Sequence, residues 1–266
     1  MRGCTARRIG GPLSNTNLRT TNAHWESVWS RPPRMRLPSP LNMGTFNAKR
    51  LLRRHVKPGM RFLEIGCAPG KMLAWVAMVL GADVAGLDSS DRGMSYTRQL
   101  FDALGIQADL RKEDIHSHTF EPGSFDVVYS SGLIEHFSDP RPTVQAHAEL
   151  ARPSGKVIIT IPNLSGWWGA PTRWLDPGVL ELHNMNIMNE TTLGALAPRD
   201  IVAVACAYRG GHFSIQHAVP VRKLPRLVSR ALMHFGDLMG FLQPVEIRFL
   251  APLLVLEITR RDVDAA

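Results

Sequence analysis

Residues 63–70 constrain this chain more than any other stretch, because they read Leu-Glu-Ile-Gly-Cys-Ala-Pro-Gly. An apolar strand runs into an acidic residue, a turn of small residues follows, and we expect a helix from about Lys71 to Leu80. Small residues at positions 66, 68 and 70 let the backbone come close to a ligand, because a Cβ atom would otherwise stand in the way. The stretch therefore predicts a cofactor-binding loop between a strand and a helix.

The spacing of the small residues separates three kinds of cofactor loop. A dinucleotide loop has the pattern G-x-G-x-x-G, but here the third small residue follows the second by two positions instead of three. A Walker A loop has four residues between its glycines and Ser or Thr after its lysine. Here three residues separate Gly66 from Gly70, and Met72 follows Lys71. The pattern that remains is E-x-G-x-[GA]-x-G.

Further features follow this loop in a fixed order. Asp88 ends a second strand about twenty residues later, where an acid can accept hydrogen bonds from ribose hydroxyls. Glu113-Asp114-Ile115 comes after a third short strand. Residues 124–137 are typical of a fourth strand and its loop, and residues 153–162 of a turn and a fifth strand. Together with the E-x-G-x-[GA]-x-G loop, this series resembles the class I S-adenosylmethionine (SAM)-dependent methyltransferases, of the type 11 and type 23 kind.

The resemblance covers residues 41–163 and, more loosely, residues 200–260. It implies an α/β fold with a Rossmann-like, mostly parallel seven-stranded sheet, an antiparallel last strand and helices on both faces. The alternation of strand and helix signals favours the same architecture. Strands are expected near 61–65, 83–87, 107–111, 125–130, 156–161, 201–206 and 253–258.

The resemblance also assigns the binding of the SAM cofactor to particular residues. Those residues are Glu64, Gly66, Cys67, Ala68, Gly70, Asp88, Ser89, Asp114, Ile115, Ser130 and Ser131. The loop would contact the methionine and ribose, and Glu64 would stabilise the loop or reach the cofactor's amino group through water. Asp88 would hold the ribose diol, with Ser89 and the 114–115 pair on either side of the adenine. The carbonyls of residues 130 and 131 would face the methionine amine. Locally, Asp88 could instead cap a helix.

His136 is the main candidate for a catalytic residue. It follows the fourth strand on the substrate side, where an imidazole could act as a general base near neutral pH. A structural or substrate-contact role is the alternative, and His183 and His212 are weaker candidates. His116 and His118 have the spacing of neighbours on one face of a strand, but no acid completes a metal site. We therefore expect metal-free transfer and no metal ligands.

Tryptophans mark the expected substrate side. Trp25 and Trp29 are four residues apart, on one face of a short helix that could cap the cofactor. Trp167 and Trp168 lie in an insertion, residues 163–190, that also contains His183. Tryptophan faces suit sugar rings, aromatic acceptors or a lipid interface, although packing onto the core is an equal alternative. Through its resemblance to methyltransferases of glycan pathways, the insertion favours a small-molecule or glycan-type acceptor.

The positive charge is confined to the N-terminal part of the chain. Residues 1–60 hold 12 Lys or Arg and one acid, whereas the remaining 206 residues hold 19 basic and 22 acidic side chains. We expect a basic disordered tail at 1–23, cap helices and a linker at 24–56, and the methyltransferase domain at 57–262. A basic arm for an anionic partner or a transit peptide are the other interpretations of the tail.

The sequence gives less information about the binding partners of this chain. No Asn-Pro-Pro-Tyr or Asp-Pro-Pro-Tyr motif follows the fourth strand, which argues against DNA, and the near-neutral domain argues against RNA. Residues 219–243 have the periodicity of an amphipathic helix, for packing over the cleft, an oligomer contact or a peripheral membrane contact. Three cysteines without a C-x-x-C pair and the lack of a long apolar run favour a cytoplasmic protein.

These observations lead to one expected function and two alternatives. The expected function is SAM-dependent methyl transfer to a small-molecule, glycan or glycolipid acceptor, at oxygen. RNA methylation and a non-catalytic SAM-binding scaffold are the alternatives.

Overall fold

The computed structural model describes residues 17–39, 43–166, 169–198, 201–210 and 246–261, and also 225, 227, 228, 231 and 235. Trp167, Trp168, His212, residues 1–16 and most of the predicted helix at 219–243 lie outside the described residues. The statements below concern the described part of the chain.

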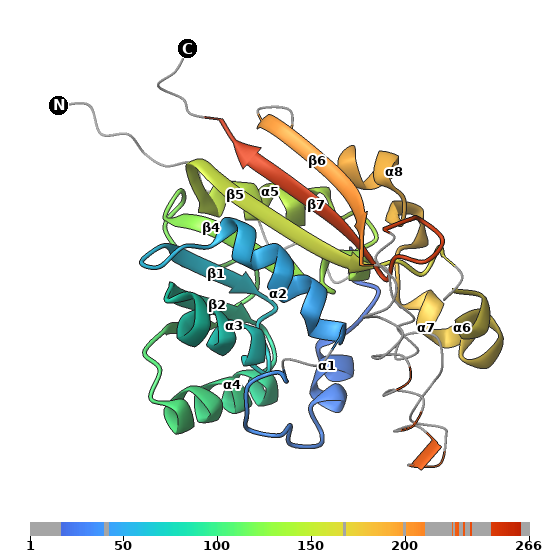
Figure 1. The fold of residues 1–266 in the computed structure, drawn as a ribbon, viewed down its shortest axis with the longest axis horizontal. Helices are drawn as coiled ribbons and strands as arrows, with labels where there is room; N and C mark the ends of the chain where they lie inside the picture. Colours follow the sequence, from blue (N-terminus) through green and yellow to red (C-terminus); the bar gives the residue numbers. More distant parts are fainter. Residues whose placement is uncertain are drawn as a thin grey trace.

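A seven-stranded sheet forms the centre of the molecule, in the order β3-β2-β1-β4-β5-β7-β6 (Figure 1). Strand β7 pairs antiparallel with both β5 and β6, while the pairs among β1 to β5 are parallel. The predicted fold class, with its antiparallel last strand, is therefore confirmed. The strands are β1 (Arg61–Ile65), β2 (Asp83–Asp88), β3 (Asp109–Lys112), β4 (Phe125–Ser131), β5 (Ala151–Pro162), β6 (Ile201–Arg209) and β7 (Leu253–Arg260).

Helices cover both faces of the sheet (Figure 1). Helix α2 crosses one face, where α3 and α4 also lie, whereas α5 and α8 lie on the other. The helices are α1 (Asn22–Val28), α2 (Met43–His55), α3 (Lys71–Trp75), α4 (Asp91–Leu104), α5 (Arg141–Leu150), α6 (Gly169–Leu175), α7 (Pro177–Glu181) and α8 (Glu190–Gly194). Short 3-10 turns are η3 (Ile134–His136) and η4 (Met185–Ile187).

The helix expected over 71–80 has two parts. Its first turn is α-helical, and residues 76–80 form a π-helical segment, η2 (Val76–Leu80). The segment ends at Gly81, whose φ of 69° is a left-handed helix cap. The sequence shows where this helix begins and ends, but it gives no signal for the wider turn.

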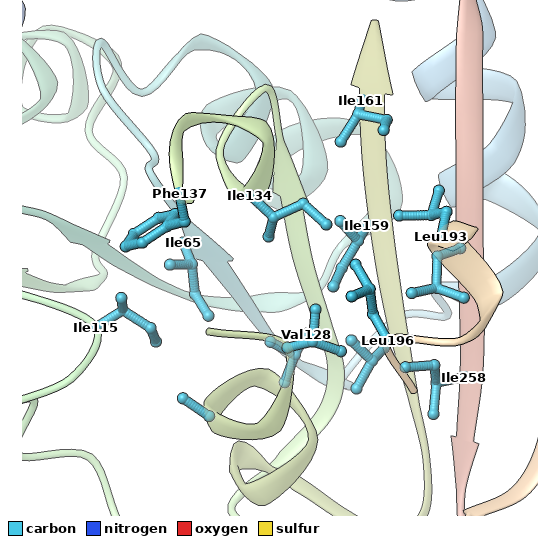
Figure 2. Packing of buried hydrophobic residues seen from close by; sticks show 14 of the residues in the cluster. Ile65, Ile115, Val128, Ile134, Phe137, Ile159, Ile161, Leu193, Leu196 and Ile258 are labelled. Atoms are coloured by element: carbon cyan, nitrogen blue, oxygen red, sulfur yellow. The ribbon is translucent and has the colours of Figure 1, made fainter. Parts of the chain in front are cut away.

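The core has two layers because side chains alternate along each strand. Ile65, Val128 and Ile159 point to the α5 and α8 face, where Leu193 and Leu196 lie (Figure 2). On the α2, α3 and α4 face, a second cluster contains Phe62, Tyr129, Ile158 and Val255, each from a strand. Burial on both faces fixes the strand registers, because a slip by one residue would exchange the two layers.

The chain before α1 also lies against the domain. Leu18 forms a β-bridge with Phe137, and the Arg19 N–H donates to the His136 carbonyl at 2.8 Å. The Asn17 side chain bonds to the backbone of Asp139 in both directions, at 2.7 and 3.0 Å. Residues 17–23, which the sequence analysis assigned to the tail, therefore form a strap beside the loop after β4.

Candidate functional site

One cavity lies at the carboxyl ends of β1, β2 and β4, where ligands bind in open parallel sheets. It encloses about 910 Å³, counting the open space at its mouth. Gly66, Ala68, Asp88 and Ser89 line it on one side, with Ser131 and Gly132 opposite.

The loop after β1 reaches the cavity through Gly66 and Ala68. Gly66 has a φ of 73°, and a Cβ there would approach only the Leu133 side chain, at 3.7 Å. The N–H groups of Gly66 and Cys67 both donate to the Leu87 carbonyl, at 2.7 and 3.1 Å. These bonds tie the loop to the end of β2, so that the backbone forms part of the cavity wall.

Asp88 organises the loop from the end of β2. One carboxylate oxygen accepts from the Ala68 N–H at 3.0 Å, and the other accepts from the Ser90 N–H at 2.9 Å. Burial raises the pKa of this carboxyl, and the two backbone N–H groups act in the opposite direction. Since each carboxylate oxygen has two lone pairs, Asp88 can still accept from a diol in the cavity.

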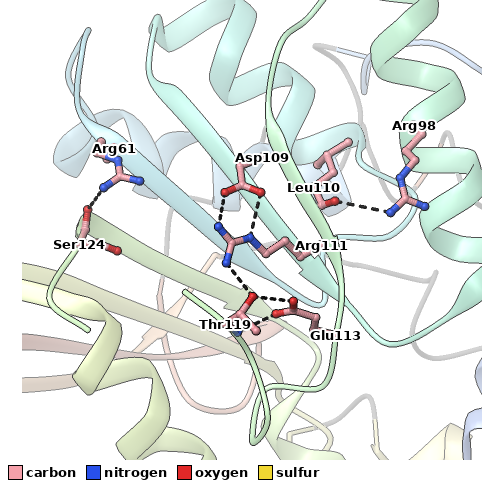
Figure 3. Close-up of polar contacts among 8 residues, drawn as sticks. All are labelled: Arg61, Arg98, Asp109, Leu110, Arg111, Glu113, Thr119 and Ser124. Atoms are coloured by element: carbon pink, nitrogen blue, oxygen red, sulfur yellow. Dashed lines mark hydrogen bonds and ion pairs between the residues drawn. The ribbon is translucent and has the colours of Figure 1, made fainter. Parts of the chain in front are cut away.

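The third strand supplies the far wall. Glu113, Asp114 and Ile115 all line the cavity. A polar network holds their loop (Figure 3): Thr119 donates its N–H and its hydroxyl to Glu113, at 2.8 and 2.7 Å. Arg111 donates to the Thr119 hydroxyl at 2.8 Å and to Asp109 at 2.6 and 3.0 Å. The loop is therefore positioned before any ligand binds.

His136 and Trp25 close the opposite end of the cavity. The two rings meet edge to face, with centroids 5.0 Å apart, and both line the cavity together with Trp29. The His136 Nδ1–H donates to the Leu182 carbonyl at 2.9 Å, which leaves the lone pair on Nε2. Burial lowers the pKa of His136 to about 4, so the imidazole is neutral at pH 7.

Helix α1 is fastened over the cavity from the side of α4. The Ser89 hydroxyl donates to the Asn22 side chain at 3.3 Å, and the Ser90 hydroxyl donates to Glu26 at 2.7 Å. Arg92 adds a bond to the Glu26 carbonyl at 3.2 Å. These contacts place Trp25 and Trp29 at the cavity, where the sequence analysis expected a cap.

Comparison with known proteins agrees with this arrangement. Residues 63–159 match a family model described as a methyltransferase domain. Among solved structures, SAM-bound phosphoethanolamine N-methyltransferase 2 of Haemonchus contortus has a TM-score of 0.59 and 16% identity, over 91% of this chain and 58% of that one. The PH0226 protein of Pyrococcus horikoshii has a TM-score of 0.60 and 15% identity, over 89% and 98%. Residues 63–159 therefore form a methyltransferase domain, and the fold is that of class I SAM-dependent methyltransferases.

Curated relatives match less than half of this chain. A protein of Azoarcus sp. named ubiquinone biosynthesis O-methyltransferase is 32% identical over 106 residues, which are 40% of this chain and 45% of that protein. Its namesake in Bordetella bronchiseptica is 34% identical over 106 residues, with coverage of 40% and 44%. The match therefore spans slightly less than half the length of these relatives.

Most of the residues predicted to bind SAM line the cavity, but four do not. The Cys67 thiol is buried beside the Met94 sulfur at 3.7 Å. At Gly70, with φ of 79°, a Cβ would lie 2.7 Å from the Thr97 side chain, so this glycine permits close packing of α4. Ser130 donates its hydroxyl to the Nε2 of buried His147 at 2.9 Å. Their roles toward the cofactor remain predictions.

Glu64 is the fourth residue set back from the cavity. It is 6% exposed, and its Oε2 is buried without a hydrogen-bond partner. Burial and the nearby charge of Asp88 raise the pKa of Glu64 to about 8. A protonated carboxyl therefore lies behind the loop in the ligand-free protein, and a cation bound nearby would favour its ionised form.

On the substrate side, the structure adds residues that the sequence analysis did not select. Leu18, Thr20, Leu133 and Phe137 line the cavity, and the buried Glu135 lies beside the lining residue Gly132, where an added Cβ would be 3.6 Å from Glu135 Oε1. His183 is not part of the lining, but its ring is 4.7 Å from that of His136. The pair His116 and His118 forms no metal-binding group among the described residues, and His116 contacts Thr143 at 3.2 Å. Within the described part of the chain, no helix is long and apolar enough to cross a membrane.

Proposed function

We propose that this chain transfers the methyl group of SAM to a hydroxyl oxygen of a small-molecule acceptor. One observation carries the proposal: a single cavity joins a cofactor end, formed around Gly66, Asp88 and Asp114, to an apolar end closed by Trp25 and His136. The names of the curated relatives support oxygen as the acceptor atom. A glycan or glycolipid acceptor stays a prediction, because Trp167 and Trp168 lie outside the described residues.

The chemistry requires positioning more than reactive side chains. The acceptor oxygen attacks the methyl carbon, the carbon–sulfur bond breaks, the hydroxyl proton leaves, and S-adenosylhomocysteine (SAH) is the co-product. Holding the two reactants in line and free of water contributes on the order of 7–11 kcal/mol. Asp88 would fix the ribose, and the wall formed by Trp25, His136 and Leu133 would place the acceptor.

His136 is a weak base for this reaction on its own. Its lone pair on Nε2 could accept the hydroxyl proton, but burial lowers the pKa of the ring to about 4. A general base works best when its pKa lies near the operating pH. We therefore propose that His136 contacts the acceptor, and that removal of the proton depends on further groups at this end of the cavity.

Cofactor binding is the first test of the proposal. Calorimetric titration of SAH and SAM into the wild-type protein should give micromolar affinity, and Asp88→Ala should weaken it at least tenfold (about 1.4 kcal/mol). Asp83→Ala is the matched control, because Asp83 begins the strand that Asp88 ends. NADH should not bind. A folded wild-type protein that binds neither SAM nor SAH would refute the proposal.

A transfer assay then tests the acceptor. With radiolabelled SAM, phenolic and catecholic compounds, glycans, glycolipids and RNA are compared under identical conditions. Label transfer to a hydroxyl compound supports the proposal. Transfer to RNA alone would support the RNA alternative instead. If SAM binds and no acceptor of any class is labelled, the non-catalytic scaffold is favoured.

A further inference from the structure

Three side chains come together at the acceptor end of the cavity. Glu135 and His136 come from η3, and His183 precedes η4. One potential ligand atom from each lies within 4.8 Å of the others. The Asn184 N–H donates to the Glu135 carbonyl at 2.6 Å, and the Asn184 side chain donates to the carbonyls of Phe137 and Ser138. These backbone bonds hold the two segments together.

Glu135 has no counter-charge among the described residues. Its side chain is 1% exposed, and its Oε2 is buried without a hydrogen-bond partner. No described lysine or arginine forms an ion pair with it. An isolated buried carboxylate is costly, so such a group is either protonated or paired with a cation. This oxygen is the unexplained polar atom of the cluster.

The two histidines are arranged as metal ligands commonly are. His136 donates its Nδ1–H to the Leu182 carbonyl at 2.9 Å, and His183 donates its Nδ1–H to the Val179 carbonyl at 2.6 Å. Each ring therefore carries its lone pair on Nε2. A bond from the second ring nitrogen to a carbonyl is the usual support for a metal-binding histidine, because it fixes the tautomer and the ring plane. Burial lowers the pKa of both rings, which keeps them neutral at pH 7.

We propose that Glu135, His136 and His183 bind a single divalent transition-metal cation, of which Zn²⁺ is the best match. Two imidazole nitrogens and one carboxylate oxygen form a three-ligand set that leaves further positions for water or substrate. Zinc bonds to these atoms are about 2.0–2.2 Å long, so ligand atoms around it lie roughly 3.3 Å apart. The three ligand atoms, which lie within 4.8 Å of one another, must move closer together when the cation binds. The proposal departs from the metal-free transfer that the sequence favoured.

The position of this site suggests that the cation activates the acceptor hydroxyl, a role that rests on the proposed function. His136 lines the cavity and contacts Trp25, so a cation held here faces the acceptor. A cation beside a hydroxyl lowers the pKa of that hydroxyl, and the proton can leave to solvent without a strong base. The oxygen then attacks the methyl group of SAM. The cation would supply the assistance that the weakly basic His136 lacks.

Metal binding can be tested apart from activity. Tag-free protein is treated with a chelator, dialysed, and titrated with ZnCl₂ by calorimetry, and with CoCl₂ while visible absorption is recorded. We expect one Zn²⁺ per chain with micromolar or tighter affinity, and d–d bands for Co²⁺ that Zn²⁺ abolishes. Glu135→Gln and His183→Ala should each weaken binding at least tenfold. His118→Ala is the matched control, because His118 is a half-buried histidine outside the cluster.

SAH titration of the same samples makes the outcomes distinguishable. Both variants should bind SAH as the wild type does, which shows that they are folded and that the cofactor end is intact. A wild-type protein that binds SAH and not Zn²⁺ or Co²⁺ would refute the metal site and leave the proposed function standing. Equal Zn²⁺ affinity in the wild type and His183→Ala would also refute it. Absence of SAH binding with intact Zn²⁺ binding would count against the proposed function alone.

Discussion

Two buried carboxyl groups lie outside the lining of the cavity, one near each end, and their surroundings differ. Glu64 lies in β1 and Glu135 follows the neighbouring strand β4; each has an unpartnered Oε2, and burial raises the pKa of each to about 8. Glu64 has Asp88 as its charged neighbour, whereas Glu135 has two neutral histidines. The first therefore belongs to an end built for a cofactor that brings its own positive charge. The second belongs to an end that offers three ligand atoms.

The two ends also differ in how the chain assembles them. The cofactor end consists of the first turns after β1, β2 and β3, so that consecutive strand ends create it. The acceptor end combines three parts that are far apart in the sequence: residues 17–29, which include the strap and α1, the turn η3, and residues 179–188. From this difference we expect a rigid, generic cofactor end and an acceptor end that depends on a few long-range contacts.

The largest expected effect tests the rigidity of the cofactor end. Gly70→Ala forces a side chain into a residue with φ of 79° and places its Cβ 2.7 Å from Thr97. Left-handed backbone costs about 1–2 kcal/mol for a non-glycine residue. Overpacking adds about 1–3 kcal/mol. Urea unfolding should show a loss of about 2–5 kcal/mol, the sum of these two costs.

Gly105→Ala is the matched control for this prediction. Gly105 also has a positive φ, 66°, but nothing lies within 4 Å of the added Cβ. It should therefore show the conformational cost alone, about 1–2 kcal/mol. If both variants lose the same free energy of unfolding, α4 moves aside for the added Cβ at little cost. The cofactor end would then be no more rigid than the acceptor end.

A smaller effect is expected from the protonated carboxyl of Glu64. Because its folded pKa is about 8 and its unfolded value is near 4.5, the folded state holds the proton more tightly between these pH values. The contribution of Glu64 to stability is therefore highest below pH 4.5 and falls as pH rises toward 8. Between pH 6 and pH 8 the wild type should lose about 2 kcal/mol relative to Glu64→Gln. Paired urea titrations at the two pH values measure the difference, and parallel pH profiles would contradict it.

The sequence alone predicted the sheet and most of the cofactor end. Alternating strand and helix signals determine a parallel sheet, and the loop and acid after each strand then fall on one edge of it. The packing of α4 is enough to explain a glycine at position 70, and its role toward the cofactor stays a prediction. A small residue in a loop indicates a close approach, but it does not indicate what approaches.

The acceptor end could not be predicted in the same way. His183 was selected as a substrate contact, yet nothing in the spacing of residues 136 and 183 shows that their rings meet. Glu135 was passed over, although a single acid within Leu-Ile-Glu-His-Phe was a signal, since an acid in an apolar stretch needs a partner. The strap at residues 17–20 lacks helical or strand periodicity, so its β-bridge to Phe137 depends on tertiary contacts alone.

A third buried titratable group, His147, should make the free energy of unfolding depend on pH in the acid range. His147 is fully buried, it donates to the Thr143 carbonyl and accepts from Ser130, and burial lowers its pKa to about 4. Its unfolded pKa is near 6.5, so its contribution to stability is complete above pH 6.5 and is lost as pH falls toward 4. From pH 7.5 to 5.5 the wild type should lose about 1.4 kcal/mol more than His147→Gln. Urea midpoints at both pH values give the measurement, and an equal loss in both proteins would show that His147 does not carry this dependence.

The smallest effect concerns the cap over the acceptor end. Thr21 is the N-cap of α1, and its hydroxyl accepts from the His24 N–H at 3.2 Å. Loss of such a cap costs about 1 kcal/mol. Because α1 buries none of its residues, Thr21→Ala should fray this helix without lowering the global urea midpoint.

Ser27→Ala is the matched control, since Ser27 bonds within the same helix and caps nothing. We expect faster hydrogen exchange in α1 alone, and SAH affinity lowered by no more than about fivefold. This result would show that α1 folds and unfolds locally while the cofactor end stays folded. A global loss of stability in Thr21→Ala would show instead that the two ends fold as one unit.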